Sequence, residues 1–316
     1  MRAIVLREFG APRNLRLEEV EDPQPGPGQV RIATRAAGVH LIDTKLRAGV
    51  QMGAVPLPAL PAIPGREVAG AVDALGDDVD RAWLGRRVVA HLGPASAGYA
   101  ELAVREADAI HALPDGLAAD AAVAMIGTGR TAMAILDAAA IAPGDRVLVL
   151  AAAGGLGSLL VQAARAAGAT VIGAAGGPEK VAHVQALGAA RAVDYRVAGW
   201  SEDVGEVTVA LDGVGGELGR AALELLAPGG RLVLYGLASG ELTPLSAGDL
   251  FRRGITASGA IGPRVRDTRA LEERALAAAA AGDLVPALQR FPLGDAAAAH
   301  TALESRATTG KVVLIP

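Results

Sequence analysis

The sequence predicts an α/β protein with a β-rich first part and a doubly wound parallel sheet in its second part. Up to about Asp120, short apolar runs such as RAIVL and VRIATRAAG are separated by Pro and Gly, a pattern typical of short strands and turns. From about Ala121 to Ala260, apolar strands alternate with helical segments. This alternation indicates a parallel sheet with helices on both faces. A glycine-rich turn between the first strand and helix of that region strengthens the prediction.

The second part contains the clearer elements. We expect strands at residues 146–151, 169–175, 191–195, 207–212, 231–236 and 255–260, and helices at 155–168, 178–188 and 215–230. The segment from residue 266 onward is expected to form two helices and a closing strand. The sequence contains no internal repeat and no low-complexity linker that would separate independent modules.

Composition excludes several classes of function. With 316 residues the chain can form two domains, each with a sizeable core. The net charge is −4 without a long run of like charges, so we expect neither a nucleic-acid nor a membrane partner. The chain has no Cys, which excludes disulfides and Cys-ligated zinc. The N-terminus carries charges throughout and has no apolar signal core, so we expect a cytoplasmic protein.

Residues 146–177, RVLVLAAAGGLGSLLVQAARAAGATVIGAAGG, allow three interpretations. A membrane span is disfavoured because Gly154, Gly155 and Gly157 interrupt it and Ala is weakly apolar. A buried strand and helix joined by a glycine turn stays open, since a glycine cluster alone is a weak signal. The third is a Rossmann-type dinucleotide cradle, in which N–H groups at the helix start face the pyrophosphate. We favour the cradle, although Ala152 stands where the first Gly is usual.

The end of the next strand favours NADPH over NADH. An NAD site usually has Asp or Glu there to hold the ribose hydroxyls, whereas this strand ends in Ala174 and Ala175. Lys180 can bind a 2′-phosphate, and Tyr195 can add a hydroxyl group or stack on the adenine. Each also has an ordinary explanation, as a solvated helix residue and a strand-end aromatic. Their combination favours NADPH.

Five segments, AAGVHLIDTKLRAG, PAIPGREVAGAV, AAAGGLG, LDGVGG and ESRATTGKVVLIP, follow one another across essentially the whole chain. In their order they resemble the medium-chain dehydrogenase/reductase superfamily, specifically its zinc-less quinone oxidoreductase branch. The resemblance implies a GroES-like β-rich catalytic domain built from residues 1–121 and 263–316. A Rossmann-type NADPH-binding domain at residues 122–262 is then inserted between them.

Zinc members of the superfamily resemble the chain in the same segments, so the metal question depends on single positions. Their first Cys ligand falls on His40, their His ligand on Arg66, and their third ligand near Ile126 or Gly127. One possible ligand beside a permanent cation cannot hold Zn²⁺, which takes three protein ligands in catalytic sites. We therefore expect a zinc-independent enzyme without a metal site.

The resemblance also implies which residues hold NADPH. They are Thr128, Thr131, Gly154, Gly155, Leu156, Gly177, Lys180, Tyr195, Gly213, Tyr235, Gly236 and Leu237, with Arg306 reaching the phosphates from the C-terminal part. Gly177 stands where the branch frequently has Ser, which removes one contact to the 2′-phosphate. Arg306 is explained equally well as a surface helix residue.

His40 and Lys45 are the candidate catalytic residues, and both depart from the branch, which usually has Asn and often Tyr there. A packed His and a solvated Lys are equally good explanations. In the functional interpretation, His40 polarises the substrate carbonyl and supplies the proton after hydride transfer, since histidine can exchange protons near neutral pH. Lys45 would attract an anionic substrate or hold a carbonyl oxygen.

The leading prediction is therefore NADPH-dependent reduction of a quinone or other conjugated carbonyl compound without zinc. The alternative within enzymes is an enoyl-thioester or alkenal reductase, which adds hydride to carbon. A third prediction, from another class, is an NADPH-binding protein with little turnover. The apolar edge strand at residues 255–260 also predicts a homodimer.

Overall fold

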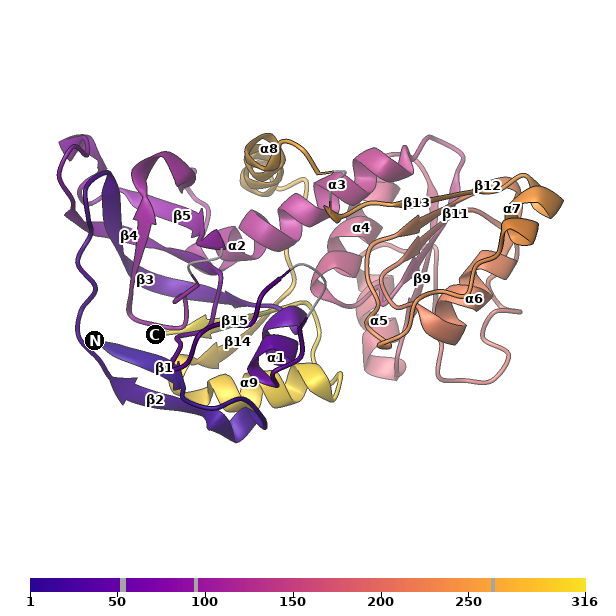
Figure 1. Cartoon of the computed structure of the whole chain (residues 1–316). Coiled ribbons are helices and arrows are strands. Elements are labelled where there is room, and N and C mark those ends of the chain that lie inside the picture. The colour runs from indigo at the N-terminus through magenta and orange to yellow at the C-terminus, as the bar shows by residue number, and fades with distance from the viewer. Residues whose placement is uncertain (52–54, 94–95, 263–264) are drawn as a thin grey trace. The chain divides into compact units, whose positions relative to one another are not determined.

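Two compact units make up the chain in the computed structural model, which describes residues 1–51, 55–93, 96–262 and 265–316 (Figure 1). The first unit combines Met1–Gly127 with Leu288–Pro316, and the second spans Thr128–Ala287. The expected domain boundaries follow residues 121 and 262. The observed boundaries follow residues 127 and 287, so both lie later in the chain. The second expected boundary also adjoins residues 263–264, which lie outside the described part.

Helix α8 (Thr268–Ala281) accounts for the later second boundary. It packs on α3 (Arg130–Ala139) within the second unit. An ion pair of 2.7 Å joins Arg130 to Glu272, and another of 2.7 Å joins Asp137 to Arg274. We expected this helix in the C-terminal part of the catalytic domain. Its contacts place it in the second unit instead.

The first unit is rich in strands. Its strands are β1 (Arg2–Leu6), β2 (Leu15–Glu19), β3 (Gln29–Val39), β4 (Glu67–Leu75), β5 (Arg87–His91), β6 (Leu102–Glu106), β7 (Ile110–Ala112), β14 (Leu288–Pro292) and β15 (Lys311–Ile315). Its helices are α1 (Leu41–Arg47), α2 (Ala119–Ala124) and α9 (Ala296–Glu304). β1 and β2 form a small sheet, while the larger sheet has the order β14-β15-β3-β4-β5-β7, with β6 also paired to β3.

Antiparallel pairing in the larger sheet determines where the first unit can hold a site. Val39 at the end of β3 pairs with Val312 of β15, and Ala37 pairs with Val68 of β4. The residue after β3 therefore lies beside the first residues of β4 and β15. Alternate side chains of β3, such as Val30 and Ile32, are fully buried in the core of this unit.

The second unit contains a six-stranded parallel sheet. Its strands are β8 (Arg146–Leu150), β9 (Thr170–Ala175), β10 (Arg191–Asp194), β11 (Val207–Asp212), β12 (Leu226–Leu234) and β13 (Thr256–Gly259). The helices besides α3 and α8 are α4 (Gly155–Ala166), α5 (Pro178–Ala186), α6 (Gly216–Glu224) and α7 (Ala247–Arg253).

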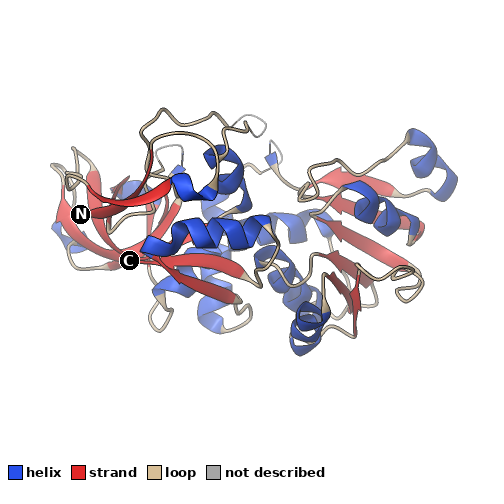
Figure 2. Ribbon diagram, turned by 90° about the horizontal axis from the view of Figure 1, so that it is seen from below, coloured by secondary structure: helices blue, strands red, loops and turns tan. Residues whose placement is uncertain are grey.

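The strands of this sheet run in the order β10-β9-β8-β11-β12-β13, and every neighbouring pair is parallel. Figure 2 shows helices on both sides of these strands. This is the strand order of a doubly wound dinucleotide-binding sheet, in which β8 and β11 flank the switch point. The predicted fold class is confirmed.

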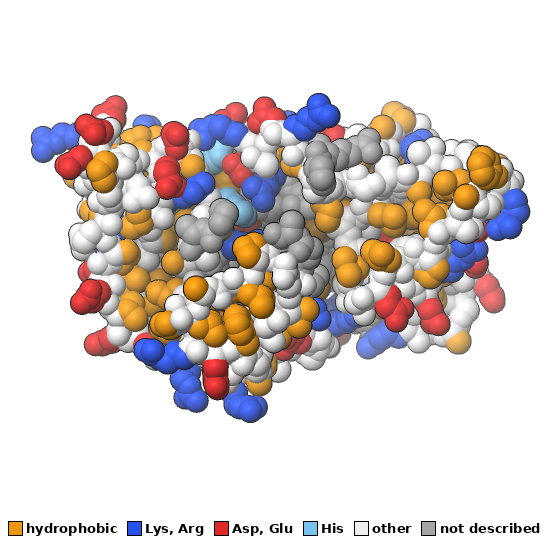
Figure 3. Space-filling view, viewed as in Figure 1, with side chains coloured by type: hydrophobic (Ala, Val, Ile, Leu, Met, Phe, Trp, Pro, Cys, Tyr) orange, Lys and Arg blue, Asp and Glu red, His pale blue; other side chains and the backbone are white. Residues whose placement is uncertain are grey.

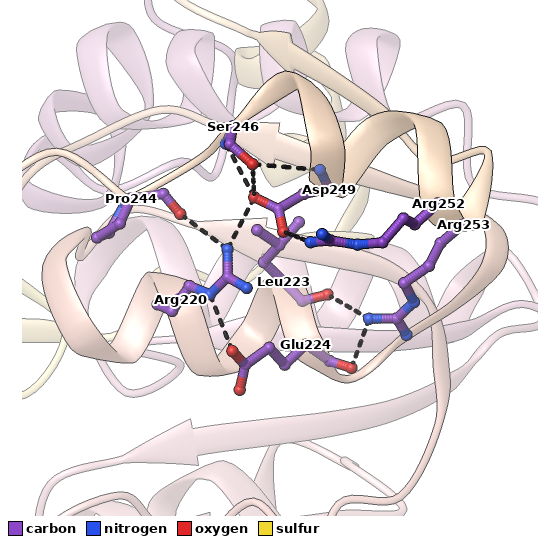
Figure 4. Close-up of polar contacts among 8 residues, drawn as sticks. All are labelled: Arg220, Leu223, Glu224, Pro244, Ser246, Asp249, Arg252 and Arg253. Atoms are coloured by element: carbon purple, nitrogen blue, oxygen red, sulfur yellow. Dashed lines mark hydrogen bonds and ion pairs between the residues drawn. The ribbon is translucent and has the colours of Figure 1, made fainter.

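Two details of the second unit differ from the expected elements. Helix α6 ends at Glu224 and β12 begins at Leu226, earlier than the alternation of apolar residues indicates, because the chain turns directly into the sheet at Leu225. Helix α7 was not expected. Figure 4 shows that polar contacts attach it to α6, where Asp249 binds Arg220.

None of the helices in the described part of the chain is long and apolar enough to cross a membrane.

Candidate functional site

The turn from β8 into α4 has the geometry of a phosphate cradle. Gly154 precedes the helix in an extended conformation, and Gly155 and Leu156 begin it. A Cβ on Gly157 would lie 2.3 Å from the carbonyl oxygen of Ala151, so only glycine allows this close contact of helix and strand. The N–H groups in the first turn of this 12-residue helix lack helical acceptors and can bind an anion.

The ends of β9 and β10 gather the residues expected at the adenosine phosphate. Ala174 and Ala175 are buried at the end of β9. Gly177 then precedes α5 with φ +102°, a conformation that favours glycine, and Lys180 lies half-buried in the first turn of α5. The Tyr195 ring lies against Gly176, where a Cβ would be 3.1 Å from its Cε2. Gly177, Lys180 and Tyr195 therefore share one corner of the second unit.

Arg196 is a basic residue at this corner that sequence reasoning missed. Its guanidinium covers Gly177, where a Cβ would lie 2.3 Å from one of its nitrogens. Two hydrogen bonds of 3.2 Å join Arg196 to Asp194, and they lower the pKa of the Asp194 carboxyl to about 2. The available signal was its position immediately after Tyr195 at a strand end.

The loops after β11 and β12 are hydrogen-bonded to one another. The Tyr235 N–H donates to the Asp212 carbonyl at 2.9 Å, and the Ala238 N–H donates to the Gly213 carbonyl at 3.1 Å. Gly236 and the exposed Leu237 lie within the second loop. Burial raises the pKa of the Tyr235 hydroxyl, so this side chain stays neutral.

Asp212 is a second residue that sequence reasoning missed. Its side chain is fully buried, and Oδ1 accepts the N–H groups of Val214 and Gly215 at 2.7 and 2.9 Å. These bonds determine the course of the loop that begins with Gly213. An acidic residue directly before a glycine-rich turn was the available signal.

The remaining candidate cofactor residues lie outside these loops. Thr128 is buried in a short π-helical turn at Met125–Gly129, and Thr131 is the second residue of α3. Arg306 belongs to the first unit, where it is exposed after α9 with φ +56°. The roles of all three toward a cofactor stay predictions.

The first unit holds a compact charged group, which we call the His40 cluster: His40, Glu67 and Lys311. His40 follows β3, while Glu67 and Lys311 begin β4 and β15, so strand pairing brings the three together. His40 Nε2 lies 2.6 Å from Glu67 Oε1 and 2.9 Å from Lys311 Nζ. Lys311 Nζ lies 3.0 Å from Glu67 Oε2. Figure 3 shows histidine side chains at the surface of this unit beside side chains of Lys or Arg.

Glu67 is the buried centre of the His40 cluster. Its side chain is 0% exposed, and that of Lys311 is 5% exposed. Burial by itself would raise the pKa of the Glu67 carboxyl, but His40 and Lys311 outweigh burial and hold the pKa below its ordinary value. Sequence reasoning singled out neither Glu67 nor Lys311. Each is a charge at the start of an apolar strand, which was the available signal.

A second polar group consists of Asp43 of α1, Tyr99 and His300. Asp43 accepts the His40 backbone N–H at 2.8 Å and the Tyr99 hydroxyl at 3.1 Å. Tyr99 Oη also lies 3.2 Å from Nε2 of the buried His300. Burial lowers the pKa of His300 to about 4 and keeps its ring neutral.

Lys45 is not part of either group. It is exposed on α1, and its side chain forms no hydrogen bond or ion pair with the residues that the structure describes. The structure thus brings His40 into a charged cluster and leaves Lys45 in solvent. A catalytic role for Lys45 stays a prediction.

A cavity of about 780 Å³ in the first unit has Asp43 in its wall, while His40, Glu67 and Lys311 are not among its lining residues. Its walls are mainly Pro, Ala, Leu and Ile side chains, and Arg66 and His91 are among its polar residues. Arg66 Nε lies 3.9 Å from Asp43 Oδ1. The cavity can therefore take a largely apolar molecule that also carries polar groups.

The residues at the family's zinc positions do not fit a metal ion. In the ranges that the structure describes, no three His, Cys, Asp or Glu side chains are grouped to hold one. A cation beside Glu67 is the ammonium of Lys311 at 3.0 Å, whereas Arg66, at the second zinc position, lies 3.9 Å from Asp43. A permanent cation at a ligand position cannot bind Zn²⁺.

Comparisons with known families match both units. Residues 26–115 match the family described as alcohol dehydrogenase GroES-like domain. Residues 155–279 match the family described as zinc-binding dehydrogenase. A quinone oxidoreductase of Pseudomonas aeruginosa is 35% identical, with 98% of this chain and 97% of that protein covered. A 2-haloacrylate reductase of Burkholderia is 34% identical, with 99% and 98% covered.

Solved structures agree with these matches. The Escherichia coli quinone oxidoreductase complexed with NADPH has a TM-score of 0.87 and 29% identity, with both chains fully covered. An NAD-dependent alcohol dehydrogenase has a TM-score of 0.89 and 30% identity, again with both chains fully covered. The neighbours therefore share the fold and differ in the nicotinamide cofactor that their descriptions name.

Proposed function

The chain belongs to the medium-chain dehydrogenase/reductase superfamily, and from this premise we propose that it is a zinc-independent, NADPH-dependent reductase of quinones or other conjugated carbonyl compounds. That it is an oxidoreductase with a nicotinamide cofactor follows from its relatives. The observation that carries the finer proposal is the His40 cluster, in which the residue at the position of the first zinc ligand, His40, is engaged by Glu67 and Lys311.

The cofactor preference rests on one corner of the second unit. Lys180 and Arg196 supply positive charge near Gly177, and no carboxylate ends β9. A 2′-phosphate is favoured there because the basic side chains attract it and nothing at the end of β9 repels it. The turn at Gly154–Leu156 would hold the pyrophosphate at the start of α4. NADPH supplies a hydride to the substrate when bound.

The chain's own residues would handle the substrate oxygen. Reduction of a conjugated carbonyl compound places negative charge on that oxygen, which needs a hydrogen-bond donor or a proton. His40 is the donor that we assign to it, because its ring is 25% exposed and the rest of its cluster is buried. The apolar cavity beside Arg66 would hold the remainder of the substrate.

Reduction of a carbon–carbon double bond is the second candidate. A relative at 34% identity is a 2-haloacrylate reductase, and Arg66 at the cavity provides a cation that could bind a carboxylate or thioester carbonyl. An NADPH-binding protein with little turnover is the third. We also propose a homodimer located in the cytoplasm.

The test is NADPH oxidation with a panel of quinones, alkenals and enoyl thioesters, before and after prolonged treatment with a strong chelator. We expect turnover with at least one acceptor and no loss after chelation. His40→Ala should lower kcat by about tenfold or more while NADPH affinity changes little. If no acceptor is turned over, the third candidate, an NADPH-binding protein with little turnover, is favoured. Loss of activity after chelation would contradict the metal-free site.

A further inference from the structure

The largely apolar cavity of the first unit has an arginine in its wall whose donors are not used. The side chain of this residue, Arg66, is 21% exposed. Its guanidinium donates no hydrogen bond to the residues that the structure describes. Asp43 Oδ1, another atom of a wall residue, lies 3.9 Å from Arg66 Nε, which is beyond hydrogen-bonding distance. The N–H groups of Arg66 are therefore available to a ligand in the cavity.

The other charged side chains of the wall are already engaged. Asp43 Oδ2 accepts the His40 backbone N–H at 2.8 Å and the Tyr99 hydroxyl at 3.1 Å, and these bonds hold its carboxylate at a distance from Arg66. Arg47 donates to two backbone carbonyls and to a carboxylate of α9. Arg66 is thus the wall cation with donors left for a further acceptor.

The backbone around Arg66 is held in place. The Ser96 hydroxyl donates to the Gly65 carbonyl at 2.9 Å, and the Leu92 N–H donates to the Arg66 carbonyl at 2.6 Å. Gly65 has φ +97°, and a Cβ there would lie 2.3 Å from the Tyr99 ring, so only glycine fits. A cation that is carried by a fixed backbone loses less freedom when it binds a ligand.

The composition of the wall indicates the chemistry of the ligand. Pro56, Pro58, Pro61, Pro64 and Ile63 are among its apolar residues, and they suit an apolar body. A carboxylate in such surroundings needs a cation, and the planar fork of a guanidinium matches its two oxygens. A phosphate dianion would need more positive charge than one such cation supplies. The wall therefore favours an apolar molecule with a carboxylate.

We propose that Arg66 is the specificity-determining residue of the acceptor site, and that the acceptor is a conjugated carbonyl compound that carries a carboxylate. This inference rests on the proposed reductase function only in making the bound acid a substrate. The family resemblance gave an arginine at this position no role in binding. Because the carboxylate takes no part in hydride transfer, its contact with Arg66 should act on KM more than on kcat.

Calorimetric titration with cinnamate and cinnamamide tests the recognition without turnover. The two probes share an apolar body and differ in a carboxylate against a neutral amide. The protein is saturated with NADP⁺, so that the anion-binding groups for the cofactor are occupied. We expect cinnamate to bind about ten- to a hundredfold more tightly, as a charge-assisted pair would give. Equal affinities for the two probes, or binding of neither, would overturn the proposal.

Two substitutions of Arg66 show whether its guanidinium causes this preference. Arg66→Met should abolish the preference for cinnamate, and Arg66→Lys should keep part of it, because lysine retains the charge and loses the fork. The control is Arg31→Met in the same unit, at a side chain that is 16% exposed, pairs with Asp73 and is not in the cavity wall. Thermal unfolding shows that each variant is folded. Full preference in Arg66→Met, or equal loss in Arg31→Met, would overturn the assignment.

The methyl resonances of isoleucine report where the acid binds. Ile63 lies in the cavity wall, whereas Ile172 is buried in the core of the second unit. In methyl-labelled protein saturated with NADP⁺, with Ile63 assigned through Ile63→Val, cinnamate should shift the Ile63 resonance and leave that of Ile172 in place. Binding without a shift at Ile63 would put the acid outside the cavity and contradict the proposal.

Turnover of trans-3-benzoylacrylate and its amide separates this inference from the proposed function. Both probes are enones, and one carries the carboxylate. Arg66→Met should raise KM for the acid by about tenfold or more relative to KM for the amide, with a smaller change in kcat. An equal rise in KM for both would contradict recognition of the carboxylate. If cinnamate binds with the expected preference but neither enone is reduced, the reductase function fails and the binding site stands. If the amide is reduced and no preference is seen, the reverse holds.

Discussion

Single basic side chains in the second unit bear on the choice between NADPH and NADH. Lys180 lies in the first turn of α5, and Arg196 covers Gly177 at the start of the same helix. Arg196 is 59% exposed and already paired with Asp194, so its contribution to phosphate binding is screened by water. Lys180 is half-buried, and a contact with a phosphate there should be stronger.

Lys180→Ala should weaken NADPH binding and leave NADH binding nearly unchanged. A charge-assisted contact contributes about 1.5–3 kcal/mol, which corresponds to a loss of roughly 10- to 100-fold. Arg196→Ala should have a smaller effect in the same direction. Fluorescence titration with both cofactors measures the ratio. Arg191→Ala, which removes an exposed ion pair with Asp203 at the other end of β10, is the control. Equal losses for both cofactors would show that Lys180 does not contact the phosphate.

At the scale of one element, the Asp249 carboxylate attaches α7 to α6 together with Arg253, which donates to the carbonyls of Leu223 and Glu224. The helix has seven residues, too few to be stable alone, and its Phe251 is 86% exposed. Asp249 accepts hydrogen bonds from Ser246 at its N-terminus and from Arg220 of α6, as Figure 4 shows. These hydrogen bonds, with the Arg220 bond first, hold the pKa of Asp249 well below its usual range. The carboxylate therefore stays ionised, and keeps its hydrogen bonds to α6, even through the pH range in which a carboxyl group ordinarily titrates.

Asp249→Asn should loosen α7 without unfolding the sheet. The amide keeps the shape of the side chain but loses the charge that holds Arg220. Hydrogen exchange followed by mass spectrometry should show faster exchange in α7 and unchanged exchange in β11 and β12. Glu224→Gln, which removes a 61% exposed partner of the same Arg220, should leave α7 protected. Faster exchange throughout the unit would mean that Asp249 supports more than this helix.

Each unit of the whole molecule has its own hydrophobic core and its own tryptophan. Trp83 packs against the core of the first unit, and Trp200 packs against that of the second. Because two units need not unfold together, a signal from one tryptophan is needed to follow one unit. The variant Trp200→Phe would let Trp83 report the first unit alone.

The stability of the first unit should fall as the pH is lowered, owing to His300. Burial lowers its pKa to about 4 in the folded chain, whereas an unfolded histidine titrates near pH 6.5. Below that pH the unfolded chain takes up a proton that the folded chain refuses, so the free energy of unfolding decreases. Between pH 7.5 and 5.5, the His300 contribution should be about 1 kcal/mol.

Denaturant unfolding of the Trp200→Phe protein, followed by Trp83 fluorescence, measures this effect. His300→Gln removes the titrating ring, so its free energy of unfolding should decrease less over the same pH interval. Identical pH dependence in the two proteins would show that His300 is not the cause.

Assembly is a further property of the whole molecule. β13 is the last strand of its sheet, and it lies between two exposed apolar side chains in the sequence, Phe251 at 86% and Ile261 at 46%. An exposed strand edge flanked by apolar side chains can pair with a second copy, so light scattering should give twice the mass of the chain. Phe251→Asp with Ile261→Asp should shift the mass to the monomer. Val197→Asp, an exposed site near β10 at the opposite end of the sheet, should not.

The amino-acid sequence by itself determined the parallel sheet and the cofactor turn. Both depend on local patterns: apart from β10 and β11, successive strands from β8 to β13 are separated by helices, and the Gly154–Gly157 turn joins neighbouring elements. The same sequence pointed to His40 through one position in one motif. Only the tertiary structure showed its partners, because Lys311 lies 271 residues further along and meets His40 through antiparallel pairing of β3 with β15. Such pairing leaves no local signal, so the buried Glu67 between them was hidden until the strands were placed side by side.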